Sequence, residues 1–350
     1  MTNIAPFAAG AFTMRETARG LTDMRRAGEA LQRQLASGRR SDNFAGLGFE
    51  RRTSLDARAQ LARLESFQAT ITRTDGRLKA TIQAVEQLDR IGADTRTMAL
   101  DAMSNVRDSQ GRPQVQALAR NNLAFAVDIL NTKFGDNHLF AGRASDERPV
   151  LPVGEIMSAL EAAIDADPLV SRNDPAGLLA FVDNFFGPNS TAWQPAGADR
   201  PGTTPPLDAR DTVRARIDDG ETIAIGARAN EDAFRRLLVG LAAMSVADTT
   251  SASGMSAEQY DALAREVAAF MSEEPMPRNV AVDLGLAHSR MGAAKERHLA
   301  SAALLQQAVD GVEGISAEET AISLLTLQTR LQASYQTTAS LSRLSLVNFL

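Results

Sequence analysis

The chain has 350 residues, of which 44% are hydrophobic and 23% are charged, and this composition excludes disorder along its whole length. A formal net charge of −6 argues against a general nucleic-acid binder, and the absence of cysteine excludes disulfides, thiolate metal sites and cysteine nucleophiles. With three histidines and 5% aromatic residues, the composition favours a helical scaffold over an enzyme.

Proline divides the chain into two arms and a centre. Eleven of the thirteen prolines lie between Pro149 and Pro277. Because proline breaks helix interiors, the flanks can form long helices and the middle cannot. We therefore predict a mainly α protein, in which the N- and C-terminal arms form a long antiparallel coiled-coil rod around a central mixed α+β insert that contains a β-hairpin.

The expected division is into three domains. Residues 1–45 with 317–350 form a terminal helical assembly domain, and residues 46–148 with 278–316 form a helical rod domain. Residues 149–277 form an insert that projects from the surface.

The N-terminal arm repeats apolar residues at steps of three and four, which is typical of a helical seam. Ser37-Gly38 predicts the end of its first helix, because glycine suits the residue after a helix. A second run of the same spacing, from Leu64 to Val106, predicts a helix longer than a compact domain needs. Gly111-Arg112-Pro113 turns the chain into a further helix to about Lys133.

In the insert, Val213, Ala215 and Ile217 alternate with polar residues up to Asp219-Gly220, which predicts a β-hairpin. The acidic residues at this turn are assigned to the hairpin and not to calcium. Helices are expected at 231–246 and 256–272, and an exposed loop over 187–206.

The C-terminal arm begins at about Arg278. Ser316 followed by Glu319 has the spacing of a capping box and predicts the start of the last helix. After Glu319 only Arg330 and Arg343 are charged. An apolar terminus of this kind indicates a partner surface, and packing onto the N-terminal arm is the alternative.

The residues expected at an assembly interface are apolar positions of the two terminal helices: Leu21, Met24, Leu31, Leu35, Leu324, Leu327, Leu331, Tyr335, Leu341, Leu346 and Phe349.

Motifs for chemistry are absent from the sequence. It contains no phosphate-binding G-K-[ST], no H-E-x-x-H and no G-x-S-x-G. His288 and His298 are ten residues apart, or ~15 Å along a helix, so they cannot share one ion. We predict no catalytic residue, no cofactor and no metal site. No apolar run of ~18 residues and no Sec signal peptide is visible, so neither membrane insertion nor a cleaved signal is expected.

Both arms resemble the flagellin family of bacterial flagellar axial proteins. The stretch Leu35–Arg40 (L-A-S-G-R-R) with Phe44–Leu47 (F-A-G-L) is similar to the family's "L-S-S-G-x-R … A-G-L" segment. Arg290–Ala293 (R-M-G-A) with Arg297 is similar to its "R-x-G-A … R" helix. The resemblance covers the arms and not the insert.

Two further stretches resemble the hook-filament junction branch of the family. Asn131–Arg143 is similar to its "N … Y-L-F-x-G" segment, and the tail from Gln332 to Leu350 to its "Q-A-S-Y … S-L-x-N-Y-L" ending. The sequence departs from the family's "D-x-D" before the last helix, where it has Ser316–Glu319.

This resemblance implies a non-enzymatic structural subunit that joins hook to filament, with a flagellin-type filament subunit as the alternative. An intracellular coiled-coil adaptor is a more distant alternative. The resemblance also implies type III export without a cleaved signal and an extracellular location in the flagellum. The implied partners are a hook-associated protein on the hook side, flagellin or a cap on the filament side, further copies of the chain, and an export chaperone.

Overall fold

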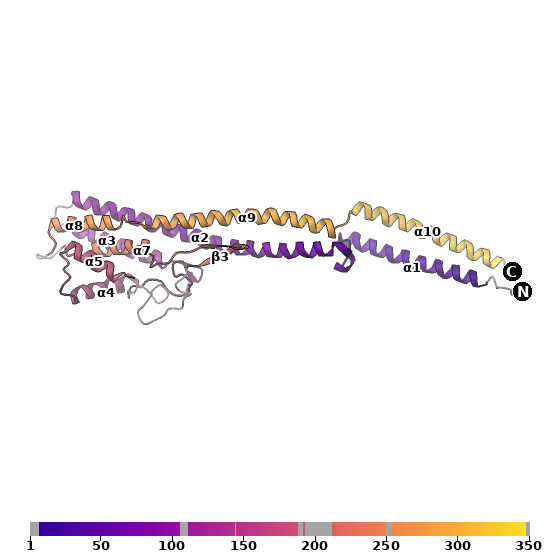
Figure 1. Cartoon of the computed structure of the whole chain (residues 1–350), viewed down its shortest axis with the longest axis horizontal. Helices are drawn as coiled ribbons and strands as arrows, with labels where there is room; N and C mark the ends of the chain where they lie inside the picture. Colours follow the sequence, from indigo (N-terminus) through magenta and orange to yellow (C-terminus); the bar gives the residue numbers. More distant parts are fainter. Residues whose placement is uncertain are drawn as a thin grey trace. The chain divides into compact units, whose positions relative to one another are not determined.

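Helices dominate the part of the chain that the computed structural model describes, which is residues 7–105, 111–143, 145–187, 192, 212–249 and 254–347 (Figure 1). The mainly α prediction is confirmed. The helices are α1 (Phe7–Ser37), the short 3-10 helix η1 (Phe44–Glu50), α2 (Arg51–Asn105), α3 (Gly111–Leu130), α4 (Val153–Ala166), α5 (Pro175–Phe185), α7 (Asp232–Val246), α8 (Ala257–Phe270), α9 (Pro277–Glu313) and α10 (Ala317–Val347).

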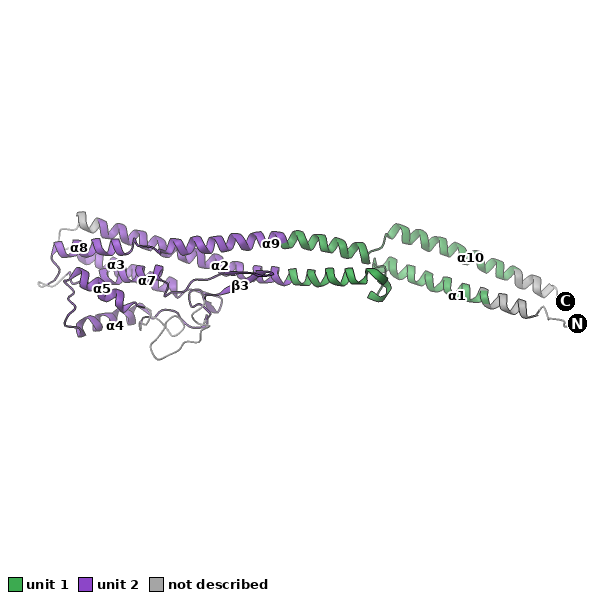
Figure 2. Ribbon diagram, viewed as in Figure 1, with its two compact units in different colours: residues 1–65, 298–350 green, residues 66–297 purple. Residues whose placement is uncertain are grey.

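The chain separates into two compact units (Figure 2). Unit 1 comprises Met1–Glu65 with His298–Leu350, and unit 2 comprises Ser66–Arg297. The long helices α2 and α9 contribute to both units. The three-domain division expected from the sequence concerns assembly, and it stays a prediction.

Unit 2 contains the hydrophobic core. Helix α7 supplies an almost continuous buried run from Leu237 to Val246, and α3, α5 and α8 pack against it. Gly240 allows α8 to approach closely, because a Cβ atom there would collide with the side chain of Met271. The largest fully buried side chains all belong to this core: Leu78, Leu88, Leu123, Leu130, Leu139, Phe140, Ile156, Leu160, Phe186, Phe234 and Tyr260.

The predicted hairpin is confirmed. Strand β3 (Arg214–Asp218) pairs antiparallel with β4 (Glu221–Ala224), and Ala215 lies opposite Ile223. Gly220 makes the turn with φ +79°, a conformation that favours glycine. The helices expected at 231–246 and 256–272 correspond to α7 and α8, so they are confirmed as well.

The two helices α4 and α5 were not predicted, because the prolines of the insert, unlike Pro113, were taken to break helices. Pro152 is the N-cap of α4, and Pro175 occupies the first turn of α5 after Asp174. Proline is favoured in a first turn, where its missing N–H costs nothing.

The small hairpin of β1 (Lys133–Phe134) and β2 (Asn137–His138) was also not predicted from the sequence. The loop predicted over 187–206 lies outside the described residues, except for Gly187 and Ala192.

In unit 1 the two terminal helices α1 and α10 run side by side and antiparallel (Figure 1). Helix α1 ends at Ser37, and Gly38 follows with φ +68°, as the sequence predicts. Helix α10 begins after Ser316, whose hydroxyl accepts a hydrogen bond of 3.3 Å from the Glu319 N–H. The C-terminal end of α1 and the N-terminal end of α10 therefore lie at the same end of the helix pair.

Candidate functional site

The structure brings six of the predicted assembly residues to one antiparallel helix pair. They are half-buried at steps of three, four and seven, and we call them the seam: Leu21, Met24 and Leu31 on α1, and Leu324, Leu327 and Leu331 on α10. A Cβ atom added at Gly28 would lie 3.6 Å from Leu327 Cδ2, which places these two helices in direct contact. Whether the seam also contacts other subunits stays a prediction.

The other predicted residues fall elsewhere. Leu35 is 39% exposed and Tyr335 is 42% exposed, so both lie at the edge of the pair. Arg25 of α1 donates a 2.8 Å hydrogen bond from Nε to the Tyr335 hydroxyl, and its guanidinium carbon is 5.5 Å from the ring centre. The side chains of Leu341 and Leu346, and Phe349 as a whole, lie outside the described residues.

Helix α10 also carries an apolar outer face that the sequence reading missed. Ile322 and Leu325 are both 63% exposed and are turned away from the seam. Their positions do not fit the spacing of three and four that selected Leu324, Leu327 and Leu331. Apolar residues off the seam, in a helix almost without charge, were the signal that could have found them.

The seam alone gives a weakly stabilised pair. Among the described residues of unit 1 the buried hydrophobic side chains are Leu47, Ala57 and Val309, none of which lies on α1 or α10. Full burial of a leucine contributes about 1.5–3 kcal/mol, so a half-buried one contributes roughly half as much. Isolated helices in water are marginal, and most of their stability comes from packing an apolar face. Further burial is therefore available to this pair through a partner.

A polar cluster of Ser54, Arg58 and Glu313, which we call the clasp, joins α2 to α9 within unit 1. Arg58 donates from Nε and Nη2 to the two carboxylate oxygens of Glu313, each at 2.6 Å. The hydroxyl of Ser54, which is buried, donates to the same carboxylate. The clasp thus ties α2 to the last residue of α9.

The ion pair dominates the electrostatics of the clasp. The hydrogen bonds from Arg58 hold the pKa of Glu313 at about 2, below the ordinary 4.5, and the Ser54 hydroxyl adds to this effect. Burial acts in the opposite direction but is outweighed. Glu313 is therefore ionised throughout the neutral range.

Backbone pairing extends the clasp to the ends of the terminal helices. Arg39 and Gly314 form an antiparallel bridge, and the Arg40 N–H donates to the Glu313 carbonyl at 2.7 Å. The Ile315 N–H donates to the Gly38 carbonyl at 3.3 Å. Arg40 also forms a 2.8 Å ion pair with Glu50 of η1. The two breaks between helices, after α1 and before α10, are therefore joined to each other.

Each of the three histidines contacts other residues or is buried. His138 is buried and donates from Nδ1 to the Asn131 carbonyl at 2.8 Å. Burial lowers the pKa of His138. His288 lies 3.0 Å from the carboxylate of Asp75, which also binds Lys79 at 2.7 Å, and His298 is buried.

The described residues contain neither a metal-binding cluster nor a membrane-spanning helix. No three of their histidine, aspartate and glutamate side chains converge in a way that could hold a metal ion. None of the helices that the structure describes is long and apolar enough to cross a bilayer.

Comparisons with known proteins place the fold. Neither a protein-family profile nor a curated protein sequence matches the chain. A solved structure from Vibrio parahaemolyticus, provisionally assigned as a flagellar hook-associated protein, matches with a TM-score of 0.50. The sequences are 11% identical over the match, which covers 77% of this chain and 99% of that one. At this identity the likeness concerns the fold: the chain is folded like that protein over most of its length.

Proposed function

We propose that the chain is a non-enzymatic structural subunit of the bacterial flagellum, which joins hook to filament and assembles through its terminal helices. The observation that carries this proposal is the contrast between the two units. Among the described side chains, the hydrophobic core cluster lies in unit 2, whereas α1 and α10 share a half-buried seam. Ile322 and Leu325 remain exposed on the outer face of α10.

Two independent similarities support a role in the flagellum. The residues around Gly38 and around Arg290 resemble the flagellin family, and the fold is similar to that of a protein assigned to the flagellar hook. On this proposal the chain contacts a hook-associated protein on one side, flagellin or a cap on the other, and further copies of itself. It leaves the cell by type III export without a cleaved signal, after release from an export chaperone.

Electron microscopy of cells that lack the gene tests the proposal. We expect bare hooks, with filament protein shed into the medium, and full filaments when the wild-type gene is restored. Normal filaments on the deletion strain would contradict a joining role. A strong band of this chain in sheared filaments would instead identify it as a filament subunit.

A further inference from the structure

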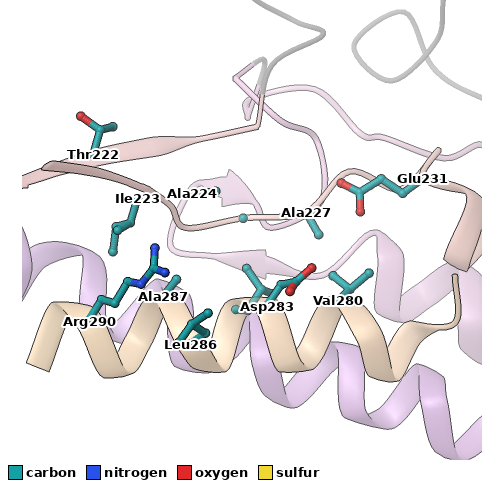
Figure 3. Close-up of a pocket in the computed structure, with 12 residues that line it drawn as sticks. Thr222, Ile223, Ala224, Ala227, Glu231, Val280, Asp283, Leu286, Ala287 and Arg290 are labelled. Atoms are coloured by element: carbon teal, nitrogen blue, oxygen red, sulfur yellow. The ribbon is translucent and has the colours of Figure 1, made fainter.

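Unit 2 contains a cavity that the assembly proposal does not use. It has a volume of about 330 Å³ and lies between helix α9 and the segment formed by β4 and the residues after it (Figure 3). Its apolar wall consists of Ile223, Ala227, Val280, Leu284 and Ala287. Cavities of this size accept a small ligand or a few side chains.

Charged side chains stand at opposite ends of the cavity. Figure 3 shows Arg290 at one end and Glu231 toward the other, with Asp283 between them and its carboxylate on the side of Glu231. Asp283 and Arg290 are seven residues apart on α9, so they share a face of the helix and are separated by about 10 Å along its axis. The cavity is therefore acidic at one end and basic at the other.

Within the described residues, Asp283 and Arg290 lack the ion-pair partners that neighbouring charged residues of α9 have. Arg297, one heptad beyond Arg290 on the same helix, binds Asp218 at 3.2 Å and Glu221 at 3.3 Å. Neither Arg290 nor Asp283 forms a hydrogen bond or ion pair in the part of the chain that the structure describes.

Glu231 adds a second carboxyl beside Asp283. It accepts a 2.8 Å hydrogen bond from the Arg228 N–H. Burial raises its pKa, and the nearby charge of Asp283 acts in the same direction, whereas the hydrogen bond and the charge of Arg228 partly oppose this rise. A cation at this end of the cavity would compensate both carboxylates.

Among the described residues, no strand pairs with the second backbone edge of β4, which lies at the same place. The Ile225 N–H donates to the Val213 carbonyl, which fixes the alternation of hydrogen bonds along the hairpin. By this alternation Thr222 and Ala224 direct their N–H and C=O groups away from β3. Both residues are exposed and line the cavity. An open strand edge beside a pocket is the arrangement that binds extended peptides.

We propose that this cavity binds an extended segment of a neighbouring subunit, which presents a basic side chain to Glu231 and Asp283 and an acidic one to Arg290. The aliphatic stem of an arginine or lysine would pack on Val280 and Leu284 while its charge reaches the carboxylates. A separation of about 10 Å corresponds to two to four residues of extended chain at ~3.3 Å each. It is longer than the distance between the α-amino and α-carboxylate groups of a free amino acid, which are attached to one carbon atom.

That the segment comes from a neighbouring subunit rests on the proposed function. That the cavity binds an extended peptide with one basic and one acidic side chain does not. Binding can therefore be tested with the purified full chain and synthetic peptides, without any flagellar assembly. The probe is a labelled peptide of alternating threonine and valine, in which an arginine and a glutamate stand four residues apart. A second peptide carries arginine at both positions. Fluorescence anisotropy measures the binding of each.

We expect the wild-type chain to prefer the mixed peptide, and Arg290→Glu to reverse this preference by about tenfold, because the acidic partner residue then meets a like charge. Lys295→Glu is the matched control: it makes the same charge change at an exposed position of α9 outside the cavity, and the wild-type preference should persist. Asp283→Lys supplies a second variant, which should lose the doubly basic peptide most strongly.

The proposal is overturned if neither peptide binds the wild-type chain, or if Arg290→Glu and Lys295→Glu change the preference equally. Either result leaves the microscopy of the deletion strain unaffected. Conversely, peptide binding with the expected reversal would stand even if the hook and filament proved to be joined by another protein.

Discussion

The carboxylate of Glu313 joins separate segments of unit 1, since it accepts hydrogen bonds from Ser54 and Arg58 of α2. Glu313→Gln keeps the size of the side chain but removes its charge. We expect a loss of about 1.5–3 kcal/mol in the stability of unit 1, because hydrogen bonds to a charged group are replaced by weaker ones. Thermal unfolding followed by circular dichroism measures this loss. Glu296→Gln, at an exposed position of α9, should have little effect.

Acid should weaken the same contact. The folded pKa of Glu313 is about 2 and the ordinary value is 4.5, so the stabilisation is complete above about pH 4.5 and is lost as the pH falls toward 2. Unfolding midpoints of the wild type and of Glu313→Gln, measured from pH 7 to pH 2, should therefore converge at the acidic end. A constant difference across this range would show that the charge of Glu313 is not what stabilises the clasp.

At the scale of elements, α10 provides a matched pair of leucines. Leu327 is half-buried against Gly28, whereas Leu325 is 63% exposed. Leu327→Ala should destabilise the helix pair by about 1–2 kcal/mol, less than the 2–5 kcal/mol of a fully buried leucine. Leu325→Ala should change the monomer by less than about 0.5 kcal/mol but weaken assembly. Hydrogen exchange in α1 and α10 and motility measure the two effects, and equal effects of both variants on exchange would contradict the assignment of the seam.

Periodicity predicted the long helices and the seam because a spacing of three and four depends only on which face of a helix is buried. The same logic overlooked Ile322 and Leu325, which lie on a face that the chain itself does not cover. It also overlooked α4 and α5, because Pro152 and Pro175 start these helices instead of breaking them. The clasp was beyond prediction, since Ser54 and Glu313 are far apart in sequence and nothing local marks them as partners.

The cavity lined by Arg290 illustrates a similar limit. The sequence singled out Arg290 and Arg297 through a single family motif, yet only Arg297 is bound by the acids of the hairpin. Which of the two arginines binds the hairpin depends on where β3 and β4 lie along α9. Packing in unit 2 determines this position, and the spacing of residues in the sequence does not reveal it.

At the scale of the whole molecule, the two units should respond differently to truncation. Removal of residues 331–350 takes away Leu331 and the end of α10 but no part of the core, which lies within Ser66–Arg297. We expect the truncated chain to keep a cooperative thermal transition and to fail to restore motility. Loss of the transition would show that unit 2 depends on the C-terminal helix, and restored motility would remove α10 from the assembly role.

Limited proteolysis of the full-length chain should show the same contrast. The half-buried seam leaves the backbone of α1 and α10 open to local unfolding, whereas α7 is enclosed by other helices. We therefore expect early cleavage within the terminal helices and a resistant fragment that contains α3, α7 and α8. Mass spectrometry of the fragments identifies the order, and early cuts within α7 would contradict it.

The paired breaks after Ser37 and before Ala317 have a mechanical consequence. Because Arg39 is bridged to Gly314 and Arg40 to Glu313, neither terminal helix can slide along the other without losing these backbone bonds. Bending is easiest where the chain is interrupted on both sides, after α1 and before α10. The two terminal helices would therefore move together as a rigid body about this common hinge. On the proposed function, such a chain could adjust the angle of its terminal helices to neighbouring subunits while the register between α1 and α10 stays fixed.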